Sequence, residues 1–107
     1  MLNGTCRNFE IRRNFADLEL HVVVVSSMHL PKKDAWGSCD AYCVVKLNND
    51  TFETHVLKNT LAPHWEESGN FDLNWVKQLK HIPDLIVEVW DWDRNSVCFL
   101  SRLILQN

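Results

Sequence analysis

Four aspartates in two separate segments could together hold a metal ion. Asp91 and Asp93 follow a hydrophobic run and have only Trp92 between them, so on an extended backbone their side chains point the same way, roughly 7 Å apart. Asp34 and Asp40 form a second pair, at the two ends of a short segment. Carboxylates that face one another repel unless a cation lies between them. If both segments lie at one end of the fold, four carboxylates converge there.

Ca²⁺ is the ion that suits such a cluster best. It is a hard cation that takes about 6 to 8 oxygen ligands at about 2.3–2.6 Å and tolerates irregular geometry built from loops. Mg²⁺ demands a tighter octahedron and gives up water reluctantly. Without the four aspartates the formal charge of the chain changes from −3 to +1, so one or two calcium ions would neutralise this end of the molecule.

Other kinds of chemistry have weaker support in the sequence. The five histidines are scattered over different segments, without the spacing of a zinc site. No group of Ser, His or Cys residues has a recognisable catalytic arrangement, so we expect no enzymatic activity. A net charge of −3 argues against nucleic acid as a partner, because phosphate backbones select clustered Lys and Arg. For the four aspartates themselves, the alternative role is that of solvated turn residues.

The hydrophobic pattern predicts the strands that must position these aspartates. Short runs rich in β-branched residues, with alternating apolar positions, are typical of strands with one buried face. We expect strands at residues 18–25, 41–47, 51–56, 69–73, 85–90 and 99–105, a first strand near 9–12, and a helical turn at 75–81. Strands at this spacing imply an antiparallel β-sandwich whose functional loops gather at one end.

Length and composition limit the chain to one globular unit. It has 107 residues, of which 46% are hydrophobic and 23% charged, values ordinary for a single domain. Apolar runs such as residues 22–25 are far short of the roughly 20 residues of a membrane-spanning helix. We expect residues 1–17 to be an N-terminal segment and 18–107 the domain. Free thiols and a cytoplasmic location are expected, although Cys39 and Cys98 would be neighbours if the two loops meet.

Three ordered motifs in this sequence resemble the C2 domain family. Residues 30–34 (LPKKD) and 37–47 (GSCDAYCVVKL) are similar to the family's first-loop signature. The segments 52–54 (FET) and 59–67 (NTLAPHWEE) resemble the motif that follows it. Residues 87–93 (VEVWDWD) resemble the family's third loop. Together the motifs cover about residues 18 to 105.

The resemblance implies an all-β, antiparallel Greek-key β-sandwich of C2 type with seven to eight strands. The last strand would be missing or atypical, because the chain stops at Asn107. In the family, the first and third loops bind Ca²⁺ and dock on phospholipid headgroups. Carried over residue by residue, the ligands are Asp34, Asp40, Asp91 and Asp93.

Two departures from the family pattern change what we expect of this chain. A fifth family aspartate has no counterpart, since Val97 and Cys98 stand before the segment 99–101; this predicts fewer ions or weaker affinity. The family's basic stretch on the fourth strand is replaced by residues 48–51 (NNDT). Strong selectivity for polyphosphoinositides through that face is therefore not expected.

The sequence thus predicts a calcium-dependent phospholipid-binding module, peripheral to membranes. Trp36, at the tip of the first loop, is a candidate for contact with the headgroup level, where an indole is favourable, and Val97 is a second candidate. The other four tryptophans are expected to fill the sandwich: Trp65, Trp75, Trp90 and Trp92. The alternative is a calcium-independent C2-like module that recruits a protein partner.

Overall fold

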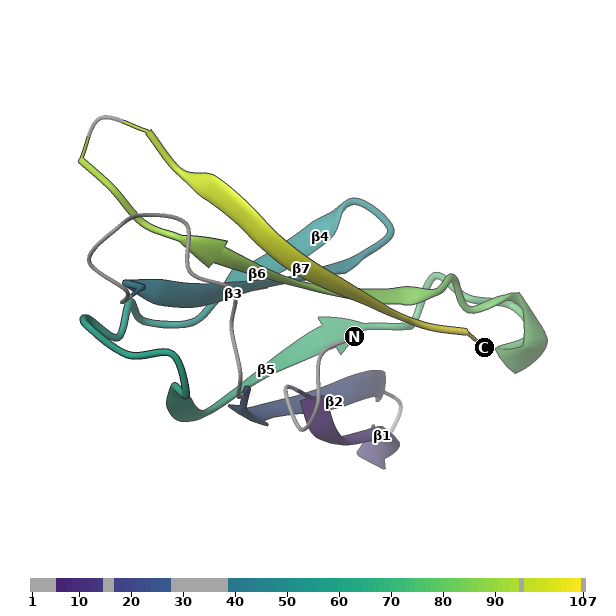
Figure 1. Ribbon diagram of the computed structural model, residues 1–107. Coiled ribbons are helices and arrows are strands. Elements are labelled where there is room, and N and C mark those ends of the chain that lie inside the picture. Colours follow the sequence, from purple (N-terminus) through teal and green to yellow (C-terminus); the bar gives the residue numbers. More distant parts are fainter. Residues whose placement is uncertain (1–5, 15–16, 28–38, 95, 107) are drawn as a thin grey trace.

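The structure is a computed structural model that describes residues 6–14, 17–27, 39–94 and 96–106. These residues form seven strands and one short 3₁₀ helix (Figure 1). The elements are β1 (Cys6–Asn14), β2 (Asp17–Ser26), β3 (Ala41–Leu47), β4 (Asp50–Glu53), β5 (His64–Asp72), η1 (Leu79–His81), β6 (Leu85–Asp91) and β7 (Cys98–Leu105). The molecule is elongated, with extents of 50 × 24 × 20 Å.

The strands form two antiparallel sheets that lie face to face (Figure 1). One sheet has three strands in the order β1-β2-β5, and the other has four in the order β4-β3-β6-β7. β2 pairs with β5 and β3 pairs with β6, although neither pair is consecutive along the chain. The chain therefore crosses to the other sheet between β2 and β3, between β4 and β5, and between β5 and β6. The predicted all-β antiparallel sandwich is confirmed, with seven strands in the described part of the chain.

The core lies between the sheets and follows the alternation that the sequence shows. In β3, the residues at every second position, from Ala41 to Leu47, are at most 2% exposed. In β2, Val22 and Val24 are completely buried. Leu85, Val87 and Val89 of β6 close the core from the middle of the four-stranded sheet. Burial of each such aliphatic side chain stabilises the fold by about 1.5–3 kcal/mol.

Several predicted elements have different bounds in the structure: the strand predicted at 51–56 is shortened to β4, and the first strand, predicted near 9–12, is longer. β5 begins at His64, five residues before the predicted strand at 69, because the charged residues Glu66 and Glu67 hide its alternation. The helical turn predicted for 75–81 is reduced to η1 over Leu79–His81. In the described part of the chain, no helix has the length and apolar composition needed to cross a membrane.

The expectation that four tryptophans fill the sandwich is wrong for three of them: Trp75, Trp92, and Trp90, which is half-buried on the outer face of β6 beside Glu88. Trp65 is 7% exposed and belongs to the core. Trp75 is 45% exposed, and its indole N–H donates to the carbonyl oxygen of Asp72 at the surface, over 2.8 Å. Trp92 is 40% exposed because it follows the end of β6, beyond the reach of the opposite sheet.

Gly69 allows the two sheets to approach closely near the β5 edge. A Cβ atom at this position would lie 2.6 Å from Cδ2 of Phe52 and 2.9 Å from Cδ1. The Phe52 ring also packs against Phe71, with ring centroids 5.7 Å apart. Because the Phe52 ring contacts both Gly69 and Phe71, the Phe71 contact restricts its movement away from an added methyl group.

We therefore expect Gly69→Ala to lower the free energy of unfolding by about 1–3 kcal/mol, the cost of overpacking a close contact. Chemical denaturation measures this change. In a Phe52→Leu background the ring is absent, so the same substitution should cost less. An equal cost in both backgrounds would show that the Phe52 contact is not the cause.

Glu88 is a charged residue buried on the outer face of the four-stranded sheet. Its side chain is 2% exposed and lies between cations on both neighbouring strands. Lys46 Nζ on β3 is 2.9 Å from Oε1, and Arg102 Nη2 on β7 is 2.7 Å from Oε2. The indole N–H of Trp90 donates to Oε1 over 3.3 Å. Every strand that borders Glu88 therefore supplies a partner for the carboxylate.

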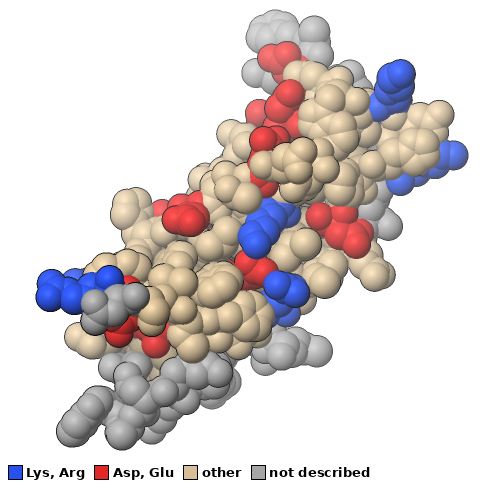
Figure 2. Space-filling model, turned by 90° about the horizontal axis from the view of Figure 1, so that it is seen from above, with Lys and Arg blue, Asp and Glu red and all other residues tan. Residues whose placement is uncertain are grey.

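These contacts decide the charge state of Glu88 and the polarity of the face around it. Burial by itself raises the pKa of the carboxyl, but hydrogen bonds from Lys46, Arg102 and Trp90 outweigh it and lower the pKa below its ordinary value of 4.5. Figure 2 looks onto this face from above and shows basic and acidic groups next to one another rather than a continuous basic patch in view. The sheet face thus balances its own charges.

We expect Glu88→Gln to lower the free energy of unfolding at pH 7 by about 1–3 kcal/mol, since both cations lose their charged partner. Because the pKa is lowered by folding, the ionised carboxylate stabilises the fold above about 4.5 and loses this effect as the pH falls through the folded-state value. Urea unfolding across this range should show the difference between the two proteins shrinking toward acid. Glu66→Gln is the control, because its 67% exposed side chain should contribute little at any pH. A difference that stays constant with pH would contradict the assignment.

Candidate functional site

Two of the predicted aspartates lie side by side at one end of the sandwich. Asp40 precedes β3 and Asp91 ends β6, and the antiparallel register of these strands places Ala41 opposite Asp91. The backbone N–H of Asp40 donates to Oδ1 of Asp91 over 2.9 Å. The N–H of Trp92 in turn donates to the carbonyl oxygen of Asp40 over 2.8 Å. We call this end, formed by Asp40, Asp91 and the connection from β6 to β7, the aspartate pole.

The segment between β4 and β5 forms a further wall of the aspartate pole. The N–H of Asn59 donates to Oδ1 of Asp40 over 2.9 Å. Thr60 N–H donates to the carbonyl oxygen of Cys39 over 2.9 Å. Asn59 has a positive φ of 58°, a conformation that Asn adopts more readily than most residues. Sequence reasoning misses this wall as part of the site, although the Asn-Thr pair that forms it belongs to a motif visible in the sequence.

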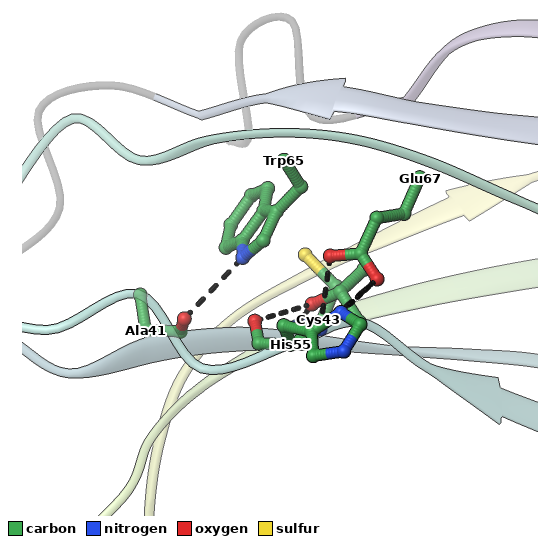
Figure 3. Close-up of polar contacts among 6 residues, drawn as sticks. Ala41, Cys43, His55, Trp65 and Glu67 are labelled. Carbon is green, nitrogen blue, oxygen red and sulfur yellow. Dashed lines mark hydrogen bonds and ion pairs between the residues drawn. The ribbon is translucent and has the colours of Figure 1, made fainter.

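Polar contacts at the start of β3 hold the backbone that carries Asp40 (Figure 3). The indole N–H of Trp65 reaches across the core to the carbonyl oxygen of Ala41, 3.3 Å away. The N–H of Cys43 donates to the hydroxyl of Thr54 over 2.8 Å. Just beyond, the His55 N–H donates to the carboxylate of Glu67 on β5 over 2.9 Å. Hydrogen bonds therefore connect the backbone next to the aspartate pole to β5 of the opposite sheet.

The rim of the aspartate pole carries exposed apolar and charged side chains. Trp92 is 40% exposed, and Lys58 Nζ lies 5.8 Å from the centroid of its ring. Val97 is 48% exposed in the same connection. Asp93 and Arg94 are also exposed. An indole, an aliphatic side chain and cations beside acidic groups are the components that a membrane headgroup layer accommodates.

The donor chemistry of the pole fits a hard divalent cation. Asp40 and Asp91 each have one carboxylate oxygen held by a backbone N–H, which orients the group without neutralising it. Among the described residues, neither aspartate forms an ion pair with Lys, Arg or His. Oxygen donors at the ends of strands, facing open loops, are what Ca²⁺ takes in proteins.

The structure brings together part of the predicted ligand set. Asp40 and Asp91 adjoin, and Asp93 follows two residues later on the exposed connection. Asp34, like Trp36, lies outside the described residues. Within the described part of the chain, no group of three or more Asp, Glu, His or Cys side chains is assembled for a metal. The full four-aspartate cluster therefore remains a prediction.

The cysteines near the aspartate pole are not linked. Cys39 is buried and Cys98 is exposed, and no disulfide joins them. Because Cys98 pairs with Asp91 in the sheet register, the β7 end of the connection lies close to the aspartates even without a disulfide.

Comparison with known sequences identifies relatives of this chain. The C2 domain family model matches residues 18–106. Multiple C2 and transmembrane domain-containing protein 1 from Rattus norvegicus is 34% identical over 87 residues, which cover 80% of this chain and 9% of that protein. Synaptotagmin-7 from Homo sapiens is 33% identical over 92 residues, covering 82% of this chain and 22% of that protein. The chain thus spans less than a quarter of the length of either relative.

Solved structures show the same fold. A C2 domain of RIM from Drosophila superposes with a TM-score of 0.76 at 19% identity, covering 92% of this chain and 82% of that one. The calcium-bound tandem C2 domains of extended synaptotagmin 2 give a TM-score of 0.70 at 23% identity, covering 82% of this chain and 34% of that one. With the sandwich, the motif order and the family model in agreement, this chain belongs to the C2 domain family.

Proposed function

We propose that this chain is a calcium-dependent phospholipid-binding module that attaches peripherally to membranes through the aspartate pole. The observation that carries the proposal is the direct contact between Asp40 and Asp91, which come from segments 51 residues apart. Asp93 and Asp34 complete the proposed ligand set. Trp36 and Val97 are the proposed points of membrane contact.

The geometry of the two central aspartates supports a metal-binding role. Their carboxylates are held in place by the backbone N–H groups of Asn59 and Asp40. Less conformational entropy is therefore lost when these side chains bind a metal ion. A cation bound at this end of the sandwich would be attracted by both carboxylates. When bound, Ca²⁺ would supply that positive charge and open coordination positions for lipid phosphate oxygens.

Electrostatics links the metal to the lipid. The four proposed ligands account for more than the whole formal charge of −3. Without a cation, the aspartate pole repels an anionic bilayer; with its charge neutralised, the exposed Trp92 and the neighbouring Lys58 can approach the headgroups. The sheet face around Glu88 balances its own charges, which favours docking by the pole over docking by that face.

The comparisons support the same proposal at the level of the family. One solved neighbour, extended synaptotagmin 2, is described as calcium bound, and that is a property of that protein. The missing fifth aspartate, where Val97 and Cys98 stand, leads us to infer fewer ions or weaker affinity here than in a five-aspartate site.

A second candidate function is a calcium-independent module that recruits a protein partner. The observation that favours it is the incomplete set of acidic ligands. The fifth family aspartate is absent, and no three Asp, Glu, His or Cys side chains of the described residues are grouped closely enough to bind one metal ion. Lipid binding with and without calcium separates the two candidates.

Cosedimentation with vesicles of phosphatidylcholine and phosphatidylserine tests the lipid step. We expect the chain to pellet with vesicles in Ca²⁺ and to stay in the supernatant with chelator. Asp91→Asn combined with Asp93→Asn should lower the bound fraction by roughly tenfold or more, since it removes two of the metal's charged ligands. The matched control, Asp17→Asn with Asp50→Asn, makes the same charge change on exposed residues elsewhere and should bind as the unchanged chain does. Equal binding in every condition would support the protein-recruitment function instead.

Thermal unfolding tests the metal step without lipid. Ca²⁺ at about ten times its Kd should stabilise the folded chain by about 1.4 kcal/mol and raise Tm by roughly 5–10 °C. Asp40→Asn with Asp91→Asn keeps an oxygen acceptor at both positions, so the backbone hydrogen bonds can persist while the calcium-induced rise in Tm is lost. If millimolar Ca²⁺ leaves the Tm of the unchanged chain where it was, the metal has no place in the function.

A further inference from the structure

The outer edge of β1 is an unusual feature of this sandwich. β1 is nine residues long and pairs with β2 on one side. Among the described residues, no strand pairs with its other side. A long edge without proline presents a row of backbone N–H and C=O groups that can pair with another strand.

The side chains of β1 that face the core are half exposed. Phe9 pairs with Val22 and Ile11 with Leu20, and directly opposed residues of antiparallel strands point to the same face. Val22 is completely buried and Leu20 is 5% exposed, yet Phe9 is 48% and Ile11 45% exposed. β1 therefore carries core-type side chains that the described part of the sandwich does not cover.

An apolar cleft lies beside these side chains. It has a volume of about 290 Å³ and opens between β1 and the end of β7, next to η1. Its main apolar lining residues are Phe9, Ile11, Leu20, Ile82, Leu85 and Leu105. A strand added to the β1 edge would extend the three-stranded sheet over this cleft and remove apolar surface from water.

The outer face of β1 carries a pair of opposite charges. Glu10 Oε1 and Arg12 Nη2 are 2.6 Å apart, and both side chains are about half exposed. In an antiparallel pair of two β1 strands related by a two-fold axis at Ile11, Glu10 of each copy faces Arg12 of the other. Opposite charges directly across two strands stabilise the pairing.

Other two-fold registers lack this complementarity. An axis at Glu10 places two carboxylates opposite each other, and an axis at Arg12 places two guanidinium groups together, both of which are unfavourable. An axis at Phe9 gives Glu10 and Arg12 uncharged partners, Asn8 and Cys6. The charge pattern therefore favours the Ile11 register.

The other sheet edges are less suited to such pairing. β4 has only four residues. β5 contains Glu66 in a left-handed conformation, with φ of 51°, and Gly69 lies under the Phe52 ring. On β7, the core-facing side chains of Leu100, Leu103 and Leu105 are buried or half-buried against the core, so this edge leaves no such side chain as exposed as Phe9 and Ile11.

We propose that two copies of this chain associate through their β1 edges, antiparallel about a two-fold axis at Ile11. The pairing joins two three-stranded sheets into one of six strands, places Ile11 against its symmetry mate, and covers the apolar cleft on each copy. Two ion pairs between Glu10 and Arg12 set the register. The association needs neither calcium nor lipid.

Sedimentation velocity over a concentration series, with chelator present, tests the proposal. We expect a reversible monomer–dimer equilibrium for the unchanged chain. Arg12→Glu turns both cross-strand attractions into repulsions and should raise the dimer Kd by roughly tenfold or more. Adding Glu10→Arg to Arg12→Glu exchanges the charges and should restore the original Kd. Arg94→Glu, which makes the same charge change in the distant β6–β7 connection (Figure 1), should leave it unchanged.

Two further readouts keep the outcomes distinct. Thermal unfolding of each variant shows whether loss of dimer comes from loss of fold, and the exchanged pair controls for damage to β1. Amide hydrogen exchange in β1 should slow as the concentration of the unchanged chain rises. A monomer at every concentration would overturn the proposal and leave the edge to a strand of another chain. A dimer that the charge exchange fails to restore would overturn it too, by placing the contact on another surface.

Discussion

The pairing of β3 with β6 aligns Ala41 with Asp91 at one end and Leu47 with Leu85 at the other. Because side chains alternate along a strand, this one register sends the apolar set of both strands into the core. It also brings the backbone N–H of Asp40 to the carboxylate of Asp91. A slip of one residue would turn the core outward and separate the two aspartates, so fold and aspartate pole depend on the same set of backbone hydrogen bonds.

The strands with regular alternation could be predicted from the sequence, because a half-buried strand needs an apolar residue at every second position. β3 and β6 have this pattern and their predicted bounds agree closely with the structure. β5 begins earlier than predicted, since its first half alternates Trp65 with charged residues and has a left-handed residue at Glu66. The residue type of Trp92 favours the core, but its place beyond the end of β6 leaves it exposed.

The aspartate pole could be predicted in part. Acidic pairs at loop positions and the order of the motifs indicate which segments should meet, and Asp40 and Asp91 do meet. The wall formed by Asn59 could not be derived from spacing, because it depends on a left-handed residue and a long-range backbone contact. The environment of Glu88 is also hidden in the sequence, since Arg102 lies 14 residues away and is recruited only by the pairing of β6 with β7.

Because the molecule is elongated, the position of the aspartate pole at one end determines how the proposed membrane contact would orient the chain. The molecule is 50 Å long but only 24 and 20 Å across, and Figure 1 shows the β6–β7 connection and η1 toward opposite ends of it. Under the proposed function, membrane contact through the aspartate pole would turn the long axis of the molecule away from the membrane plane. A segment joined near η1 would then lie at the end of the molecule that is farther from the membrane surface.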